Sequence, residues 1–204
     1  MYELEFLGRY IHVLVGIVWI GMLYYFNFVQ TEYFKEAEAG AKSDAMAKLA
    51  PRALWWFRWG AMLTFLTGAY LLHKVGAFGA TMPAIWMGAL AGTFMFLNVW
   101  LIIWPNQQIV LGMKEGEGPV AAAKAGLASR TNTLFSGPML LGMLASKHLP
   151  MNGTETGLYA ALGLIVVLEA NALFGGLGPM KSVTGVIHSS LALTLVVFGL
   201  LNYL

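Results

Sequence analysis

The chain contains several apolar stretches of about 20 residues, which restrict its fold more than any other feature. A helix of that length crosses the roughly 30 Å of hydrocarbon in a bilayer. The composition agrees, because 58% of the 204 residues are hydrophobic and only 11% are charged, against roughly a quarter in an average soluble domain. We therefore expect an all-α integral membrane protein, with one transmembrane helical-bundle domain over residues 1–204.

About six segments are predicted to cross the membrane, and Pro138 interrupts the fourth and shortest of them. An alternative has five spans and a re-entrant fourth segment. Two long, charged, Ala-rich links, 31–52 and 106–130, are expected to form surface helices. The predicted spans are Phe6–Gln30, Ala53–Gly76, Pro83–Trp104, Asn132–His148, Thr156–Phe174 and Val183–Tyr203.

The basic residues are distributed unequally between the two sides of this topology. Of the 12 Lys and Arg residues, only Arg9, Lys74 and Lys147 fall on the side of the termini, and the remaining nine fall on the other side. Because cytoplasmic loops are enriched in Lys and Arg, both termini are expected outside and the two long links in the cytoplasm.

Cysteine is absent, and the net charge is only +2. A chain without cysteine has no disulfide, no thiolate metal site and no C-x-x-C-H motif for covalent haem c. Any redox centre must therefore be held non-covalently. The small net charge gives no indication of a nucleic-acid partner.

Three histidines are expected in the outer half of the membrane, where ionisable groups are costly and usually functional. His12 lies six residues into the first predicted span, roughly 9 Å below the outer surface. We expect it to bind haem or a metal, with His73 or His148 as the second cofactor ligand. The alternatives are a hydrogen-bonded structural role for His12, and polar helix ends at the surface for His73 and His148.

A second polar layer is predicted in the cytoplasmic half. Arg58 and Glu169 would supply charge there, and His188 would be the acid or base. Glu169 and His188 lie on neighbouring antiparallel spans, so a purely structural buried pair is the alternative. Along the membrane normal His12 and His188 should be about 10 Å or more apart, which disfavours this pair as the ligands of one haem.

Several stretches within residues 6–150 resemble, in order, the membrane domain of the bacterial membrane-bound urate oxidases (urate hydroxylases). The most specific parts are "PNQ" after the third span and "SR-x-N" before the fourth, whereas the fifth and sixth spans do not match the long family members. The first span is also similar to small haem-binding bundles, the four-helix protoporphyrinogen oxidases and the copper-resistance membrane proteins. The matching stretches are "HVLVGIVWIGMLYYFNFVQ", "PRALWWFRWGA", "WPNQQIVLG", "SRTNTLFSGPML" and "ASKHLP".

The resemblance implies a redox protein of a bacterial inner membrane that binds haem b and passes electrons from a small substrate or a quinol to a separate carrier. Family members carry a C-terminal cytochrome c, and this sequence ends at Leu204 without one, so an external cytochrome c is the expected acceptor. Amide and guanidinium groups suit the carbonyls and ring nitrogens of an oxidised purine. Substrate binding is therefore predicted for Asn98, Asn106, Gln107, Arg130 and Asn132.

Two other classes of function remain open at this stage. The chain could be a non-catalytic accessory subunit of a respiratory or other membrane complex, which uses the bundle for packing alone. A small transporter is less favoured, because the sequence shows no inverted repeat. For Asn106, which follows Pro105, a helix cap is the alternative to substrate binding.

Overall fold

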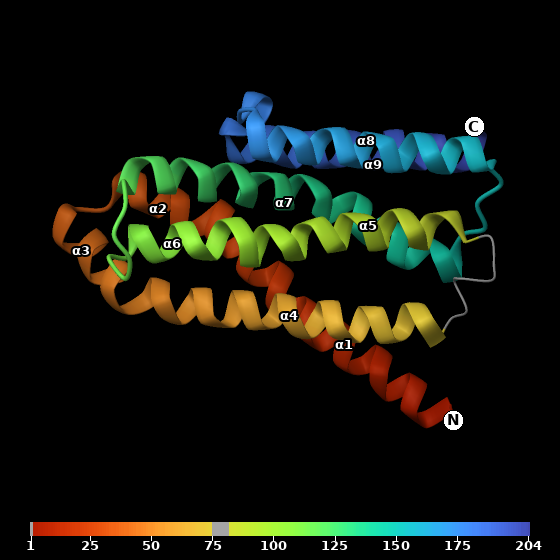
Figure 1. Ribbon diagram of the computed structural model, residues 1–204, viewed down its shortest axis with the longest axis horizontal. Coiled ribbons are helices and arrows are strands. Elements are labelled where there is room, and N and C mark those ends of the chain that lie inside the picture. The colour runs from red at the N-terminus through yellow and green to blue at the C-terminus, as the bar shows by residue number, and fades with distance from the viewer. Residues whose placement is uncertain (1, 75–81) are drawn as a thin grey trace. The chain divides into compact units, whose positions relative to one another are not determined.

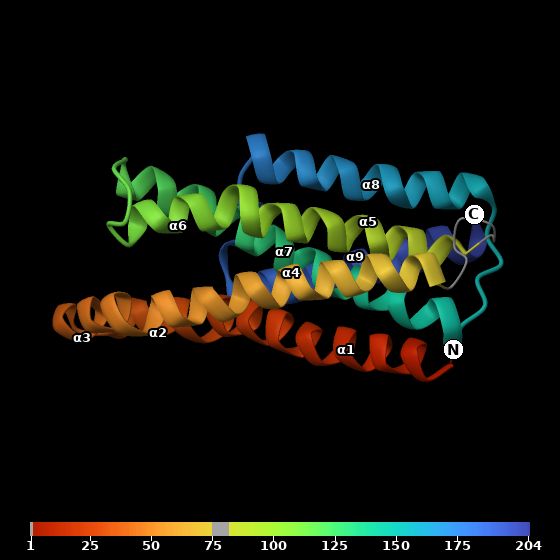
Figure 2. The same cartoon turned by 60° about the horizontal axis from the view of Figure 1, so that its bottom comes forward.

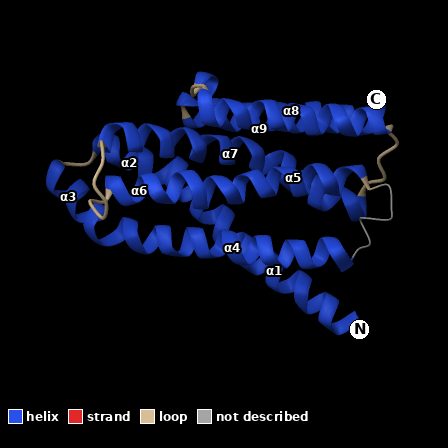
Figure 3. Cartoon of the chain, viewed as in Figure 1, coloured by secondary structure: helices blue, strands red, loops and turns tan. Residues whose placement is uncertain are grey.

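A computed structural model describes residues 2–74 and 82–204, and these residues are almost entirely helical, with no strand among them (Figure 3). The predicted all-α class is therefore confirmed. The predicted short link 75–82 and the last two residues of the second predicted span lie outside the described residues, apart from Met82.

Six long helical stretches correspond to the six predicted spans (Figure 1). Short helices, some with π-helical turns, extend them or join them. The bounds are α1 Tyr2–Tyr24, η1 Tyr25–Gln30, α2 Thr31–Glu36, α3 Ala39–Asp44, η2 Ala45–Leu49, α4 Ala50–Lys74, α5 Pro83–Leu97, η4 Asn98–Ile103, α6 Trp104–Val110, α7 Gly118–His148, α8 Glu155–Phe174, η5 Gly178–Lys181 and α9 Val183–Tyr203.

Four helical stretches of the described chain are long and apolar enough to cross a membrane: Glu3–Glu36, Pro83–Val110, Glu155–Phe174 and Val183–Tyr203. The first of these joins α1, η1 and α2 into one continuous helix (Figure 2). α4 and α7 are also long helices, but their sequences are less apolar. α4 contains two arginines and α7 begins with a polar, Ala-rich segment.

α7 differs from the predicted fourth span in where it starts. The prediction began at Asn132, whereas the helix begins at Gly118, because the run "VAAAKAGLASR" before Asn132 is rich in strong helix formers. The helix also continues through Pro138 without a break. One unbroken helix is incompatible with the alternative of a re-entrant fourth segment.

The described residues group into two compact units. The first unit comprises Met1–Thr67 and Phe96–Ser129. Here α1 and α4 pack closely, since a Cβ atom on Gly60 would lie 3.1 Å from the backbone nitrogen of Trp19. The Asn27 side chain donates hydrogen bonds to Leu23 O (2.9 Å) and to Ser129 Oγ (2.8 Å), which ties η1 to the start of α7.

The second unit comprises Gly68–Met95 and Arg130–Leu204. α5 and α7 meet at two glycines, because a Cβ on Gly142 would lie 2.6 Å from the Cα of Gly88. α8 and α9 lie side by side, as the contacts between them establish. Small residues at helix contacts of this kind let backbones approach closely in membrane bundles.

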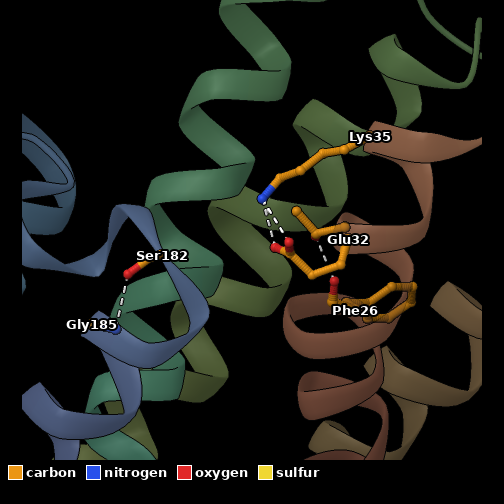
Figure 4. Close-up of polar contacts among 6 residues, drawn as sticks. Phe26, Glu32, Lys35, Ser182 and Gly185 are labelled. Carbon is orange, nitrogen blue, oxygen red and sulfur yellow. Dashed lines mark hydrogen bonds and ion pairs between the residues drawn. The ribbon is translucent and has the colours of Figure 1, made fainter.

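Side-chain contacts also fix helix ends and turns (Figure 4). Ser182 caps α9 by accepting a hydrogen bond from the backbone N–H of Gly185 at 3.0 Å. In α2, Lys35 pairs with Glu32 at 2.7 Å on an exposed surface. The predicted helical character of the link 31–52 is confirmed by α2, α3 and η2.

Candidate functional site

His12 lies on α1 in the first unit, half-buried, and its ring contacts α4. Its Nδ1 atom is 2.9 Å from Oγ1 of Thr67. The Thr67 hydroxyl has one proton, and Leu63 O lies within hydrogen-bond distance of it at 2.7 Å. The hydroxyl also lies 3.1 Å from Thr64 O, and the tautomer of His12 decides which partner of the His12–Thr67 contact donates. In the tautomer with hydrogen on Nδ1, the lone pair of His12 Nε2 can bind an iron or accept a proton.

The other two outer histidines are exposed. His73 lies in the last turn of α4 and His148 is the last residue of α7, both within the second unit. Positive or polar groups at helix C-termini interact favourably with the helix dipole. These positions agree with the alternative, in which His73 and His148 are polar helix ends at the surface. Their role as cofactor ligands stays a prediction.

A run of buried polar residues on α7 is the most unusual feature of the second unit. Arg130 is 6% exposed, Thr131 and Asn132 are 0% exposed, and Thr133 is 2% exposed. One turn later Ser136 is also buried. We call these five residues, Arg130 to Thr133 and Ser136, the α7 polar segment. Four consecutive polar residues without solvent access are costly unless all are satisfied within the protein.

The α7 polar segment is held by interactions inside the chain. Asn132 donates a hydrogen bond from Nδ2 to Met95 O on α5 at 2.9 Å. Ser136 donates one to Thr133 O at 2.7 Å. Arg130, Thr131 and the other members likewise take part in interactions. The hydrogen bonds to Met95 O and Thr133 O fix the side chains of Asn132 and Ser136.

Glu169 and Ser190 add two further buried polar groups to the second unit, on α8 and α9, each 7% exposed. Glu169 takes part in interactions within the chain. His188, which the sequence placed opposite Glu169, is on an exposed face of α9. Its ring forms no hydrogen bond or ion pair with any residue that the structure describes. The predicted Glu169–His188 pair is thus not formed here.

The remaining predicted residues belong to the first unit. The guanidinium of Arg58 on α4 stacks on the ring of Trp104, with Cζ 3.7 Å from the ring centroid. Asn98, the first residue of η4, is 1% exposed. Asn106 donates a hydrogen bond from Nδ2 to Ile102 O at 2.7 Å within its own helix. This local bond supports the structural alternative for Asn106, whose neighbour Gln107 is half-buried.

Six buried polar residues were missed by the sequence reasoning, namely Asn27, Thr64, Thr131, Thr133, Ser136 and Ser190. For Thr131, Thr133 and Ser136 a signal exists, since "SRTNTLFS" is a polar run that crosses the start of the predicted fourth span. Among the residues described, no group of three or more His, Asp or Glu side chains could hold a metal ion. A metal at His12 stays a prediction.

The second unit also contains an apolar groove of about 450 Å³. It is lined by the end of α4, one face of α5 and the start of α8. The lining residues are Leu72, Trp86, Ala89, Leu90, Thr93, Leu158 and Leu162.

Comparison with known families gives one match. The family model described as urate oxidase N-terminal matches residues 74–174. This range contains the whole α7 polar segment and also Glu169, and it extends through α8, which we had not expected to match. No curated protein and no solved structure matches the chain.

Proposed function

Because the chain belongs to the urate oxidase N-terminal family, we propose that it is a membrane redox protein that oxidises urate or a similar small substrate. The observation that carries this proposal is the α7 polar segment. It lies within the matched range and is buried inside a helical unit. A polar segment of this kind is suited to bind a polar, planar molecule away from bulk water.

The membrane part of the proposal rests on six spans, four of them the long apolar stretches. α4 and α7 would be the other two. Two of their charges are shielded, since Arg58 stacks on Trp104 and Arg130 is 6% exposed. The excess of Lys and Arg in the long links supports a bacterial inner-membrane location with both termini outside.

The substrate-binding part uses Arg130 and Asn132. Urate is an anion with carbonyl and ring N–H groups, and a guanidinium can pair with it through two parallel hydrogen bonds. An amide offers both a donor and an acceptor. Hydroxylation of urate with water adds one oxygen atom and releases two electrons and two protons. Glu169, buried in the same unit, is better placed than the exposed His188 to take up a proton.

The electrons need a carrier, and His12 is the residue that would hold a haem iron. Its contact with Thr67 orients the ring, and in the tautomer with hydrogen on Nδ1 the Nε2 atom would be the ligand atom. Haem b would supply one-electron transfer when bound. An external cytochrome c is the proposed final acceptor.

Urate binding by the purified protein tests this proposal. We would measure the rise in melting temperature in detergent with increasing urate, for the wild type, Arg130→Lys, Arg130→Gln and the control Lys124→Gln. Lys124 is exposed on the same helix. We expect wild type and control to bind equally, and both Arg130 variants to bind at least tenfold more weakly. If the folded Arg130 variants bind urate as tightly as the wild type, Arg130 is not part of the binding site.

One observation favours a second candidate, an accessory subunit of a larger membrane complex. His188 is exposed about five residues into α9, which is one of the four apolar stretches. An imidazole facing lipid is costly, whereas one facing a partner subunit is not. Purification in a mild detergent decides between the candidates. A stoichiometric partner, together with a chain that binds neither urate nor haem, would favour the subunit.

A further inference from the structure

A shallow, open surface pocket lies at the start of α4, in the first unit and apart from the residues discussed above. Four residues line it: Pro51, Arg52, Trp55 and Trp56. Arg52, Trp55 and Trp56 are spaced i, i+3 and i+4, so their side chains share one face of the helix.

Trp55 and Trp56 expose a large aromatic surface. Trp55 is 45% exposed and Trp56 is 57% exposed. Their rings meet edge to face with centroids 5.0 Å apart. Among the described residues, neither indole N–H has a hydrogen-bond acceptor. Large aromatic surface with a free polar edge is typical of residues at the boundary between lipid and water.

Arg52 adds a positive charge beside these two tryptophans. It is exposed and forms no ion pair with any described carboxylate. Two neighbouring cations, in contrast, have partners. One turn earlier, Lys48 pairs with Asp44, and Arg58 is stacked on Trp104. Arg52 is therefore the cation of this stretch that remains available to an external anion.

We propose that this surface pocket binds the phosphate headgroup of an anionic phospholipid from the surrounding bilayer. The Arg52 guanidinium would pair with the phosphate oxygens, and the two indole rings would contact the glycerol and upper acyl region. A choline headgroup carries its own positive charge, so the unpaired Arg52 disfavours it. The site rests on the proposal that α4 enters a membrane, but it does not depend on urate or haem.

Quenching of tryptophan fluorescence by brominated lipids tests the site. The purified protein in detergent is titrated with brominated phosphatidylglycerol or brominated phosphatidylcholine. We expect saturable quenching, with phosphatidylglycerol favoured about fivefold, the size expected for one basic residue near an anionic surface. A wild type that is quenched equally by both lipids would overturn the site.

Two variants identify the residues. Arg52→Gln should abolish the preference, whereas Lys48→Gln, which removes the same charge one turn away, should keep it. Replacing both tryptophans, Trp55→Phe with Trp56→Phe, should remove most of the saturable quenching. Equal losses in the Arg52 and Lys48 variants would show a general charge effect and contradict the site. If Arg52→Gln does not fold, Arg52→Lys should show a weakened preference, and an unchanged one would count against Arg52.

Two further results distinguish a lipid phosphate from free phosphate as the ligand, and the lipid-site proposal from the proposed redox function. Inorganic phosphate at 10-fold excess over the lipid should not displace it, and displacement would overturn the lipid assignment in favour of free phosphate. Arg52→Gln should bind urate and haem as the wild type does. A chain that prefers the anionic lipid but binds neither urate nor haem would refute the redox function and leave the lipid site intact.

Discussion

The Nδ1 atom of His12 lies 2.9 Å from Oγ1 of Thr67, and this contact joins α1 to α4 in the first unit. Because the threonine hydroxyl also has backbone acceptors at Leu63 O and Thr64 O, the contact favours the His12 tautomer with hydrogen on Nδ1. In that tautomer the Nε2 lone pair of His12 is available to a metal.

Replacement of Thr67 by valine should release the His12 ring. The loss of one hydrogen bond should lower the free energy of unfolding by about 1 kcal/mol, and the freed ring should bind haem less tightly. Thr67→Ser should restore both properties. Thr93→Val is the matched control, since Thr93 donates only to Ala89 O on its own helix. Unfolding in detergent and haem content measure the two effects, and identical behaviour of the Thr67 and Thr93 variants would argue against the contact.

Gly142→Ala should destabilise the second unit. The new Cβ would lie 2.5 Å from Ala84 O and 2.6 Å from the Cα of Gly88, and both are backbone atoms that cannot move away. We expect a cost of about 1–3 kcal/mol in unfolding free energy. Gly126→Ala, on the same helix but with nothing within 4 Å of its Cβ, should be stabilising by about 0.5–1 kcal/mol. Opposite signs for the two variants are the expected result.

Two asparagines that looked alike in the sequence should behave differently. Asn132→Ala removes a hydrogen bond between α7 and α5 at a fully buried position, so it should cost about 1–3 kcal/mol. Asn106→Ala removes a bond within one helical turn at a half-buried position, so it should cost less than about 1 kcal/mol. Denaturant unfolding of both variants checks this order, and the reverse order would contradict it.

The proposed orientation can be tested with a reporter that is active only in the periplasm. Fused after Leu204, it should be active, because nine of the 12 Lys and Arg residues fall on the opposite side of the six-span topology. Fused within the link 106–130, it should be silent. A stable but silent fusion after Leu204 would reverse the orientation.

Helix positions were largely predictable from the sequence, because each apolar run ends where turn residues or charges begin. α8 and α9 begin within one residue of the predicted spans. The start of α7 was not predictable from hydropathy, because its first turns are polar and Ala-rich. Helix propensity, rather than burial, determines where that helix begins.

Burial of individual polar residues was harder to predict. The depth of each residue along its predicted span suggested a layer containing Arg58, Glu169 and His188. Depth does not specify, however, which face of its helix a side chain occupies. Glu169 is buried and His188 is exposed, although both are about five residues from a helix end. The rotation of each helix is determined by contacts such as Gly137 against Ser190 and Thr194, which come from packing between distant segments.

The most direct test of the proposed redox function is a reduced-minus-oxidised visible spectrum of the detergent-purified protein, with extraction to identify and count any haem. We expect a b-type spectrum at about one haem per chain. It should be lost in His12→Ala and retained in His188→Ala, since the His188 ring forms no hydrogen bond or ion pair with a described residue. A colourless protein, purified without stripping conditions, or full haem in both variants, would contradict the assignment of His12.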